Sequence, residues 1–140
     1  MQFSEEQKAS RYFTPSQAVK TLPLVRSIVQ DILLFGKQLR ERILFLQSEG
    51  IKDLEHDEDC IAYMDSLEDL YNELQELGCE YKDWNFSIGL VDFPAIHEGR
   101  EILLCWKSDE ETINHYHGRY EGFADRKVIP DSWFSTENEE

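Results

Sequence analysis

The sequence predicts an α+β fold in which a long antiparallel helical hairpin packs with a small antiparallel β-hairpin or sheet and a short third helix. Apolar residues recur at spacings of three and four along the first half of the chain, which is typical of amphipathic helices. After Gly78 the spacing changes to the alternation typical of strands. The chain has 140 residues, and we expect one domain over 1–140 with flexible tails at 1–10 and 135–140.

The first helix is expected to begin at Thr14. Thr14 can cap it, Pro15 suits the first helical position, and Gln17 completes a capping box. Pro23 is expected to restart or kink the helix, because proline cannot donate a backbone hydrogen bond. The helix should then continue to about Glu49, with an apolar stripe made of Val25, Ile28, Ile32, Phe35, Leu39, Ile43 and Leu46.

A second helix is expected from about Glu58 to Leu77, ending at Gly78. The loop before it is short and acidic, which predicts that the two helices form an antiparallel hairpin. Leu34 and Phe45 lie off the stripe of the first helix and would leave an exposed apolar patch. We therefore expect a homodimer, the commonest closed assembly.

The part of the chain after Gly78 should begin with a β-hairpin. A strand from Ile88 to Phe93 should be closed by Pro94, and a turn at 97–100 should lead into a second strand over Glu101–Lys107. Ser108 with Glu111 three residues later resembles a capping box, which predicts a third helix over 109–120. Residues 124–134 are expected to be irregular or to hold one short strand.

Charge and composition exclude several classes of function. The chain has 14 Lys and Arg against 29 Asp and Glu, a net charge of −15, so we expect neither nucleic acid nor an anionic membrane as a partner. No apolar run is long enough to span a membrane. Three cysteines without a CxxC pair favour a reducing, cytoplasmic location.

Two clusters could bind a metal, but we interpret both structurally. Acidic residues at 53–59 alternate like calcium ligands yet lack the glycine and glutamate of an EF-hand, so we assign them to a helix N-terminus. His115 and His117 would diverge on the predicted helix. Cys60, Cys79 and Cys105 are dispersed and are interpreted as packing residues. We therefore expect no cofactor and no tight structural zinc.

Arg126 is the most promising ligand-binding residue. In so acidic a chain, a small anion should bind where cationic groups converge, and Arg126 with His117 or Arg100 could hold a carboxylate or phosphate. Trp106 could supply an apolar wall for that ligand. The alternative is an internal salt bridge from Arg126 to Asp92 or Glu101.

Several segments together resemble a known family. They are Arg11-Tyr12-Phe13-Thr14, Leu22-Pro23-Leu24-Val25-Arg26, Gly89-Leu90-Val91-Asp92-Phe93-Pro94-Ala95, Gly99-Arg100-Glu101, Leu104-Cys105-Trp106-Lys107, His117 and Gly122-Phe123-Ala124-x-Arg126. Over about 11–129 the chain resembles a bacterial family catalogued as domain of unknown function 2203. Tyr116 and Asp125 depart from the family's usual Trp and Gly. The resemblance implies a cytoplasmic bacterial protein and supplies no mechanism.

Two functions follow from these observations. The first is a non-enzymatic binding or interaction module that acts through self-association or a protein partner, since no catalytic motif is present. The alternative is a small-ligand or metal-assisted enzyme that uses Asp92, His117 and Arg126 around Trp106, at the β-hairpin and the third helix.

Overall fold

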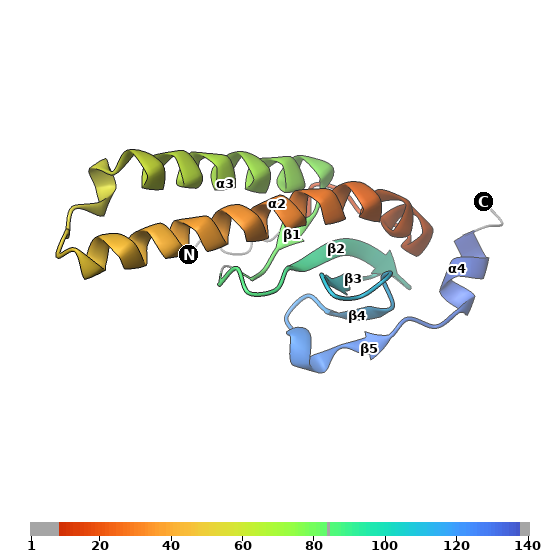
Figure 1. The fold of residues 1–140 in the computed structure, drawn as a ribbon. Helices are drawn as coiled ribbons and strands as arrows, with labels where there is room; N and C mark the ends of the chain where they lie inside the picture. The colour runs from red at the N-terminus through yellow and green to blue at the C-terminus, as the bar shows by residue number, and fades with distance from the viewer. Residues whose placement is uncertain (1–8, 84, 138–140) are drawn as a thin grey trace.

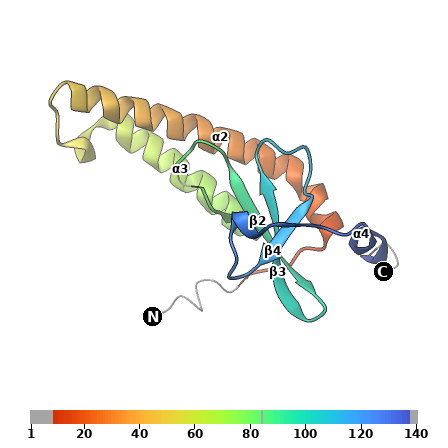
Figure 2. The same ribbon diagram turned by 90° about the horizontal axis from the view of Figure 1, so that it is seen from below.

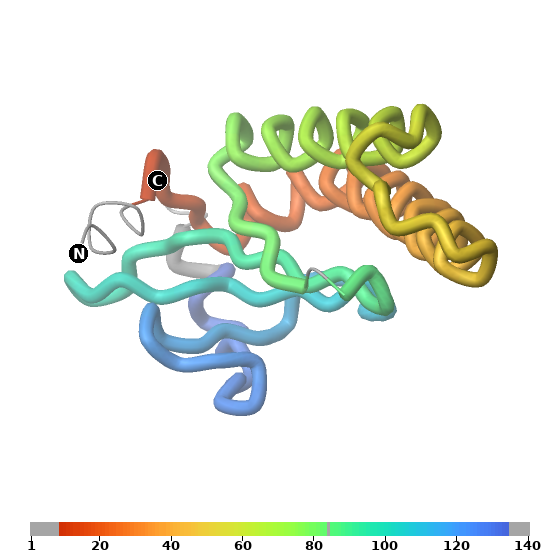
Figure 3. The backbone as a smooth tube through the Cα atoms, turned by 90° about the vertical axis from the view of Figure 1, so that its left-hand side faces the viewer, coloured from red at the N-terminus to blue at the C-terminus, as the bar shows by residue number. Residues whose placement is uncertain are grey.

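The computed structural model describes residues 9–83 and 85–137, and most of the two predicted tails lies outside these ranges. Among the described residues, a hairpin of two long helices covers one face of a five-stranded antiparallel sheet, as Figure 1 shows. The side view in Figure 3 separates the helical layer from the sheet layer. The predicted α+β class is therefore confirmed.

Helix α2 (Pro15–Ser48) begins with the predicted capping box. The Gln17 backbone N–H donates to Thr14 Oγ1 at 3.1 Å, and the Gln17 side-chain oxygen accepts from the Thr14 backbone at 3.0 Å. The helix continues through Pro23, so the predicted restart there is wrong. Burial explains the continuity, because Leu22 and Val25 on either side of Pro23 are both in the core.

Helix α3 (Glu58–Leu77) runs back along α2 after the short 3-10 helix η1 (Leu54–His56), which confirms the predicted hairpin. Asp57 caps α3 by accepting from the Cys60 backbone N–H at 3.0 Å, and Arg42 of α2 donates to both of its carboxylate oxygens. The acidic loop therefore stabilises the N-terminus of α3, as predicted. Gly78 ends α3 in the left-handed conformation with φ of 96°.

The sheet follows the chain in the order β1 (Glu80–Tyr81), β2 (Leu90–His97), β3 (Arg100–Lys107), β4 (His115–Gly118) and β5 (Lys127–Val128). β2 and β3 form the predicted β-hairpin, with His97 paired to Arg100. Glu98 and Gly99 form the two-residue turn with φ of 53° and 77°. Two positive φ values are typical of the type I′ turn, whose twist matches that of the strands.

Pro94 lies inside β2 instead of closing it, so that part of the prediction is wrong. The Pro94 carbonyl accepts a hydrogen bond from the Phe13 backbone N–H at 2.7 Å, so the carbonyl of Pro94 faces away from β3. On that side β1 pairs with Asp92 and Val91 and does not reach Pro94. A proline is tolerated there because no ladder hydrogen bond needs its missing N–H.

The predicted third helix is also wrong, because residues 115–118 form strand β4. Ser108 and Glu111 do not cap a helix. The Ser108 hydroxyl instead accepts from the Gly89 backbone at 2.9 Å, and the Glu111 carbonyl accepts from Arg26 at 2.7 Å. Tertiary contacts therefore outweigh the local helix signal. Past β4 lie the 3-10 helix η2 (Phe123–Asp125), β5, and helix α4 (Ser132–Glu137), which the sequence did not predict.

The two faces of the sheet have different contents. Phe93, Leu104 and Trp106 face the helices and belong to the main core. Asp92 and Cys105 occupy alternate positions and are also buried, but they point to the opposite face, which we call the outer face. Within the described ranges, no helix combines the length and apolar character needed to cross a bilayer.

Candidate functional site

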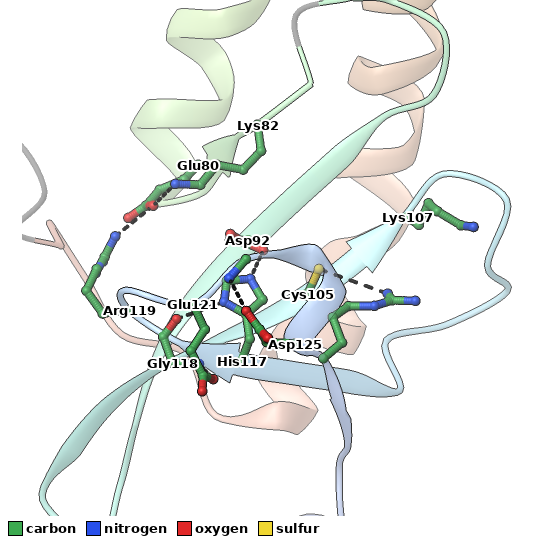
Figure 4. Close-up of polar contacts among 12 residues, drawn as sticks. Glu80, Lys82, Asp92, Cys105, Lys107, His117, Gly118, Arg119, Glu121 and Asp125 are labelled. Atoms are coloured by element: carbon green, nitrogen blue, oxygen red, sulfur yellow. Dashed lines mark hydrogen bonds and ion pairs between the residues drawn. The ribbon is translucent and has the colours of Figure 1, made fainter.

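Three buried polar side chains from adjacent strands meet on the outer face of the sheet. Asp92 lies on β2, Cys105 on β3 and His117 on β4, and their exposed fractions are 2%, 2% and 4%. Asp92 is paired with Cys105 and Leu103 with His117, so alternation places all three on one face. We call this group the Asp–Cys–His cluster, and Figure 4 shows it from close by.

Two contacts fix the imidazole ring of His117. Its Nε2 atom lies 3.3 Å from Asp92 Oδ1, and its Nδ1 atom lies 2.8 Å from the carbonyl oxygen of Gly118. Because a carbonyl only accepts, Nδ1 carries a proton and donates it. The nitrogen that faces the cluster is therefore Nε2.

The charges of the cluster depend on one another. Burial lowers the pKa of His117, but the hydrogen bonds that the imidazolium donates to Asp92 and Cys105, together with the negative charge of Asp92, outweigh it and raise the pKa to about 10. Burial raises the pKa of the Cys105 thiol, against an opposing effect of His117. At neutral pH the cluster of the metal-free protein thus holds an imidazolium beside a neutral thiol.

This arrangement differs from a catalytic triad. In a triad the carboxylate binds one ring nitrogen of the histidine and the nucleophile binds the other. Here Nδ1 of His117 is occupied by the Gly118 carbonyl, and Asp92 faces Nε2. His117 therefore has no free nitrogen with which to accept a proton from Cys105, and the thiol is not activated as a nucleophile.

A cavity of about 160 Å³ adjoins the cluster. All three cluster residues line it, together with apolar and charged side chains of the surrounding loops and strands. The remaining lining residues are Lys82, Leu90, Leu103, Arg119, Glu121, Gly122 and Phe123. The cavity has room for roughly five water molecules, or for a ligand of comparable size.

The charged side chains beside the cavity are held by ion pairs. Arg119 donates to Glu101 through Nε and Nη2 and to Glu80 through Nη1, and its side chain is 7% exposed. Lys82 contacts the same Glu80 oxygen at 3.1 Å. Glu121 accepts from the Gly118 backbone at 2.8 Å. These pairs fix the side chains that surround the cavity without sealing it.

Arg126 lies beside the cluster but is paired with a different acid from those predicted. Its guanidinium donates to both oxygens of Glu110, at 3.0 and 2.9 Å, whereas Glu101 is bound to Arg119. Nη1 of Arg126 also lies 4.0 Å from Cys105 Sγ. The guanidinium carbon is 4.2 Å from the centre of the Phe123 ring, which lines the cavity.

The other two predicted site residues lie elsewhere. Trp106 is fully buried on the helix-facing side of the sheet, where its Nε1 donates to the Glu110 carbonyl at 2.9 Å, so it cannot form a wall of this cavity. Arg100 is at the tip of the β2–β3 hairpin and lines a separate surface hollow with His97 and Trp133. The structure thus brings Asp92 and His117 together, with Arg126 nearby.

The sequence analysis did not predict that Cys105 lies beside Asp92 and His117, or that His115 and His117 share a face. In β4, His115 and His117 share a face, whereas the predicted helix would have separated them. Among the described residues, Asp92, Cys105 and His117 form a group of candidate metal ligands with one atom from each within 4.8 Å of the others. The alternation in His115-Tyr116-His117 was the available signal for a strand.

Comparisons with known proteins bear on the family alone. The model of a family described as "Uncharacterized conserved protein (DUF2203)" matches residues 11–129. The match includes every residue of the Asp–Cys–His cluster and every residue that lines its cavity. No curated protein and no solved structure matches the chain.

Proposed function

The chain belongs to the uncharacterised conserved family DUF2203, whose description assigns no activity, and we propose from the geometry of the site that it binds a small polar molecule in the cavity beside the Asp–Cys–His cluster. The alternative predicted from the sequence was a small-ligand or metal-assisted enzyme. The present proposal places a ligand at two of the residues named for that enzyme, Asp92 and His117, and specifies no reaction. The polar contacts would come from Asp92 and Lys82, and the apolar contacts from Leu90, Leu103 and Phe123.

One observation carries this proposal. A charged histidine–aspartate pair is almost fully buried, with side chains 5% and 2% exposed, at a cavity that no side chain fills within the described part of the chain. Burying two charges costs free energy that their mutual attraction often fails to recover. Such a pair beside a cavity of ligand size is therefore better explained by binding than by stability.

A side chain can be added at the edge of the cavity without disturbing the fold. Gly122 lines the cavity, has an extended backbone with φ of −113°, and has nothing within 4 Å of the position of an added Cβ. We expect acetate, glycine, lactate, phosphate or glycerol to shift the backbone NMR signals of residues around Asp92 and His117. Gly122→Leu should remove these shifts and Gly122→Ala should largely keep them. Shifts confined to other surfaces, or unaffected by Gly122→Leu, would count against the proposal.

A second candidate function, self-association, has its own support. The half of the helical hairpin that contains the α2–α3 connection, which we call the distal half, extends past the sheet in Figure 2. Leu34 and Phe45, predicted to lie off the stripe, are 50% and 53% exposed. Other large apolar side chains exposed in this half of the hairpin are Leu44, Ile51, Ile61 and Met64. An interface between two copies of the chain would cover these side chains.

Light scattering of the full chain tests this second candidate. We expect a dimer at micromolar concentration that becomes a monomer when Leu34 and Phe45 are both changed to Glu. Leu24→Glu is the matched control, because Leu24 is 53% exposed on the same helix outside the distal half. A wild-type monomer at that concentration would exclude self-association through the hairpin.

A further inference from the structure

We infer that the Asp–Cys–His cluster is the binding site of a divalent transition-metal ion of the zinc class, held by Asp92, Cys105 and His117. The inference rests on the proposed function in one respect, because the ion would lie at the floor of the proposed ligand cavity. It also revises the expectation from the sequence that no zinc would bind, which assumed that residues 115–117 are helical.

The spacing of the donor atoms supports the inference. One donor atom from each of the three residues lies within 4.8 Å of the other two, and His117 Nε2 is 3.3 Å from Asp92 Oδ1. In a tetrahedral zinc site with ordinary bond lengths, neighbouring donor atoms are roughly 3.3–3.6 Å apart. The nitrogen–oxygen distance already has this value, and a sulfur at the 4.8 Å limit would come into range with a shift of about 1.2 Å.

The surroundings orient the donors as a metal site requires. Metal-bound histidines almost always donate their second ring N–H to a carbonyl or carboxylate, which fixes the ring. His117 does this through Nδ1 and the Gly118 carbonyl, so Nε2 is the nitrogen turned toward Asp92. Arg126, held by Glu110, places a guanidinium nitrogen 4.0 Å from Cys105 Sγ, where it can stabilise a thiolate.

The donor set selects the class of ion. A thiolate and an imidazole favour zinc and similar transition metals, whereas magnesium and calcium require oxygen ligands. Binding would release the thiol proton of Cys105 and the imidazolium proton of His117 to solvent. One thiolate and one carboxylate then balance the charge of a divalent ion. With three protein donors in the described cluster, the fourth coordination position would open into the cavity.

A structural ion pair is the competing explanation. In that case His117 and Asp92 stabilise each other, Cys105 fills space, and the three atoms converge because the strands are adjacent. The two explanations differ in one respect that can be measured directly. A metal site needs the sulfur of Cys105 as a ligand, whereas an ion pair needs no particular atom there.

Cobalt(II) reports sulfur ligation without any assay of activity. The full chain, purified and freed of metal with a chelator, is titrated with cobalt(II) and followed by absorption. We expect one equivalent to bind, with a sulfur-to-cobalt charge-transfer band and the intense visible bands of four-coordinate cobalt. Cys105→Ser should abolish the charge-transfer band. Cys60→Ser and Cys79→Ser are matched controls, since both cysteines are also buried, and they should keep it.

Variants of the other two ligands complete the test. Asp92→Asn and His117→Gln should each weaken cobalt and zinc binding by more than about 100-fold, because loss of a supporting residue alone costs 10–100-fold. Thermal melts of each metal-free variant establish that it folds. A wild-type chain without the charge-transfer band, or a band that Cys105→Ser keeps, overturns the inference.

The outcomes for the two proposals are separable. If cobalt binds through Cys105 and none of the small molecules enters the cavity, the metal site stands and the proposed ligand binding fails. If a small molecule binds and Gly122→Leu blocks it while cobalt gives no sulfur band, the ligand site stands and the metal site fails.

Discussion

His117 Nε2 and Asp92 Oδ1 are 3.3 Å apart although their strands are separated by β3, and both side chains are almost fully buried. The two side chains reach each other across the outer face of the middle strand, beside Cys105. This contact, with Cys105 beside it, brings together side chains from β2, β3 and β4. Its properties can be tested in the metal-free protein, independently of any ligand.

The first prediction is that His117 stays protonated in the metal-free protein at pH 8. Burial opposes its charge, but the hydrogen bonds and the charge of Asp92 raise its pKa to about 10. Proton NMR of the imidazole should show no titration between pH 6 and 8. Asp92→Asn should lower the pKa of His117 markedly, and Asp125→Asn, a change of an exposed acid in η2, should leave it where it is.

The second prediction separates Trp106 from the site. Trp106 is fully buried on the helix-facing side, and its Nε1 donates to Glu110. Trp106→Phe should lower the free energy of unfolding by about 1–2 kcal/mol, because it removes a hydrogen bond and leaves a void. Cobalt binding and NMR shifts at the cavity should stay as in the wild type. A loss of binding in a folded Trp106→Phe protein would place Trp106 in the site after all.

The helical hairpin could be predicted because its signals are local and long. An apolar stripe, a capping box at Thr14 and a glycine at position 78 all lie within the segments that they define, and the structure confirms them. The signals that predicted the β2–β3 hairpin also lie within the residues that form it. The homodimer stays a prediction, because nothing in one chain tests it.

The Asp–Cys–His cluster could not be predicted because it depends on strand register. Asp92 and His117 are 25 residues apart, and they meet only when β4 is a strand paired with β3 in one register. The apparent capping box of Ser108 and Glu111 favoured a helix over the same residues. Arg119 shows the same limit, since its partner Glu80 lies 39 residues away, across the sheet. Local patterns carry no information about such contacts.

The third prediction concerns stability in acid. Burial opposes the charge of Glu110, but its hydrogen bonds with Arg126 and the Lys107 backbone lower its pKa below the ordinary value. A lowered pKa in the folded state stabilises the protein above the ordinary carboxyl pKa, and that contribution is lost as the pH falls through the folded value. Glu110→Gln should lower the free energy of unfolding at pH 7 by about 1–2 kcal/mol.

Urea unfolding from pH 7 to pH 3 provides the measurement for Glu110. The gap between wild type and Glu110→Gln should narrow as the pH falls, because the wild-type carboxylate becomes protonated. Glu98→Gln, at the exposed turn of the β2–β3 hairpin, serves as the control and should follow the wild type. A gap that stays constant over this range would mean that the Arg126–Glu110 pair does not contribute to acid stability.

The last prediction asks whether the buried pair serves stability. Removing one member should cost about 3–5 kcal/mol, because the other charge is left buried without a partner. Replacing both by apolar residues often costs little or even stabilises a protein. Asp92→Leu alone should therefore destabilise the metal-free chain strongly, and the double variant Asp92→Leu with His117→Leu should recover most of the loss. The double variant should bind neither cobalt nor the small molecules. A double variant that is less stable than Asp92→Leu alone would show that the pair is retained for stability, and would remove the main physical argument for a binding site.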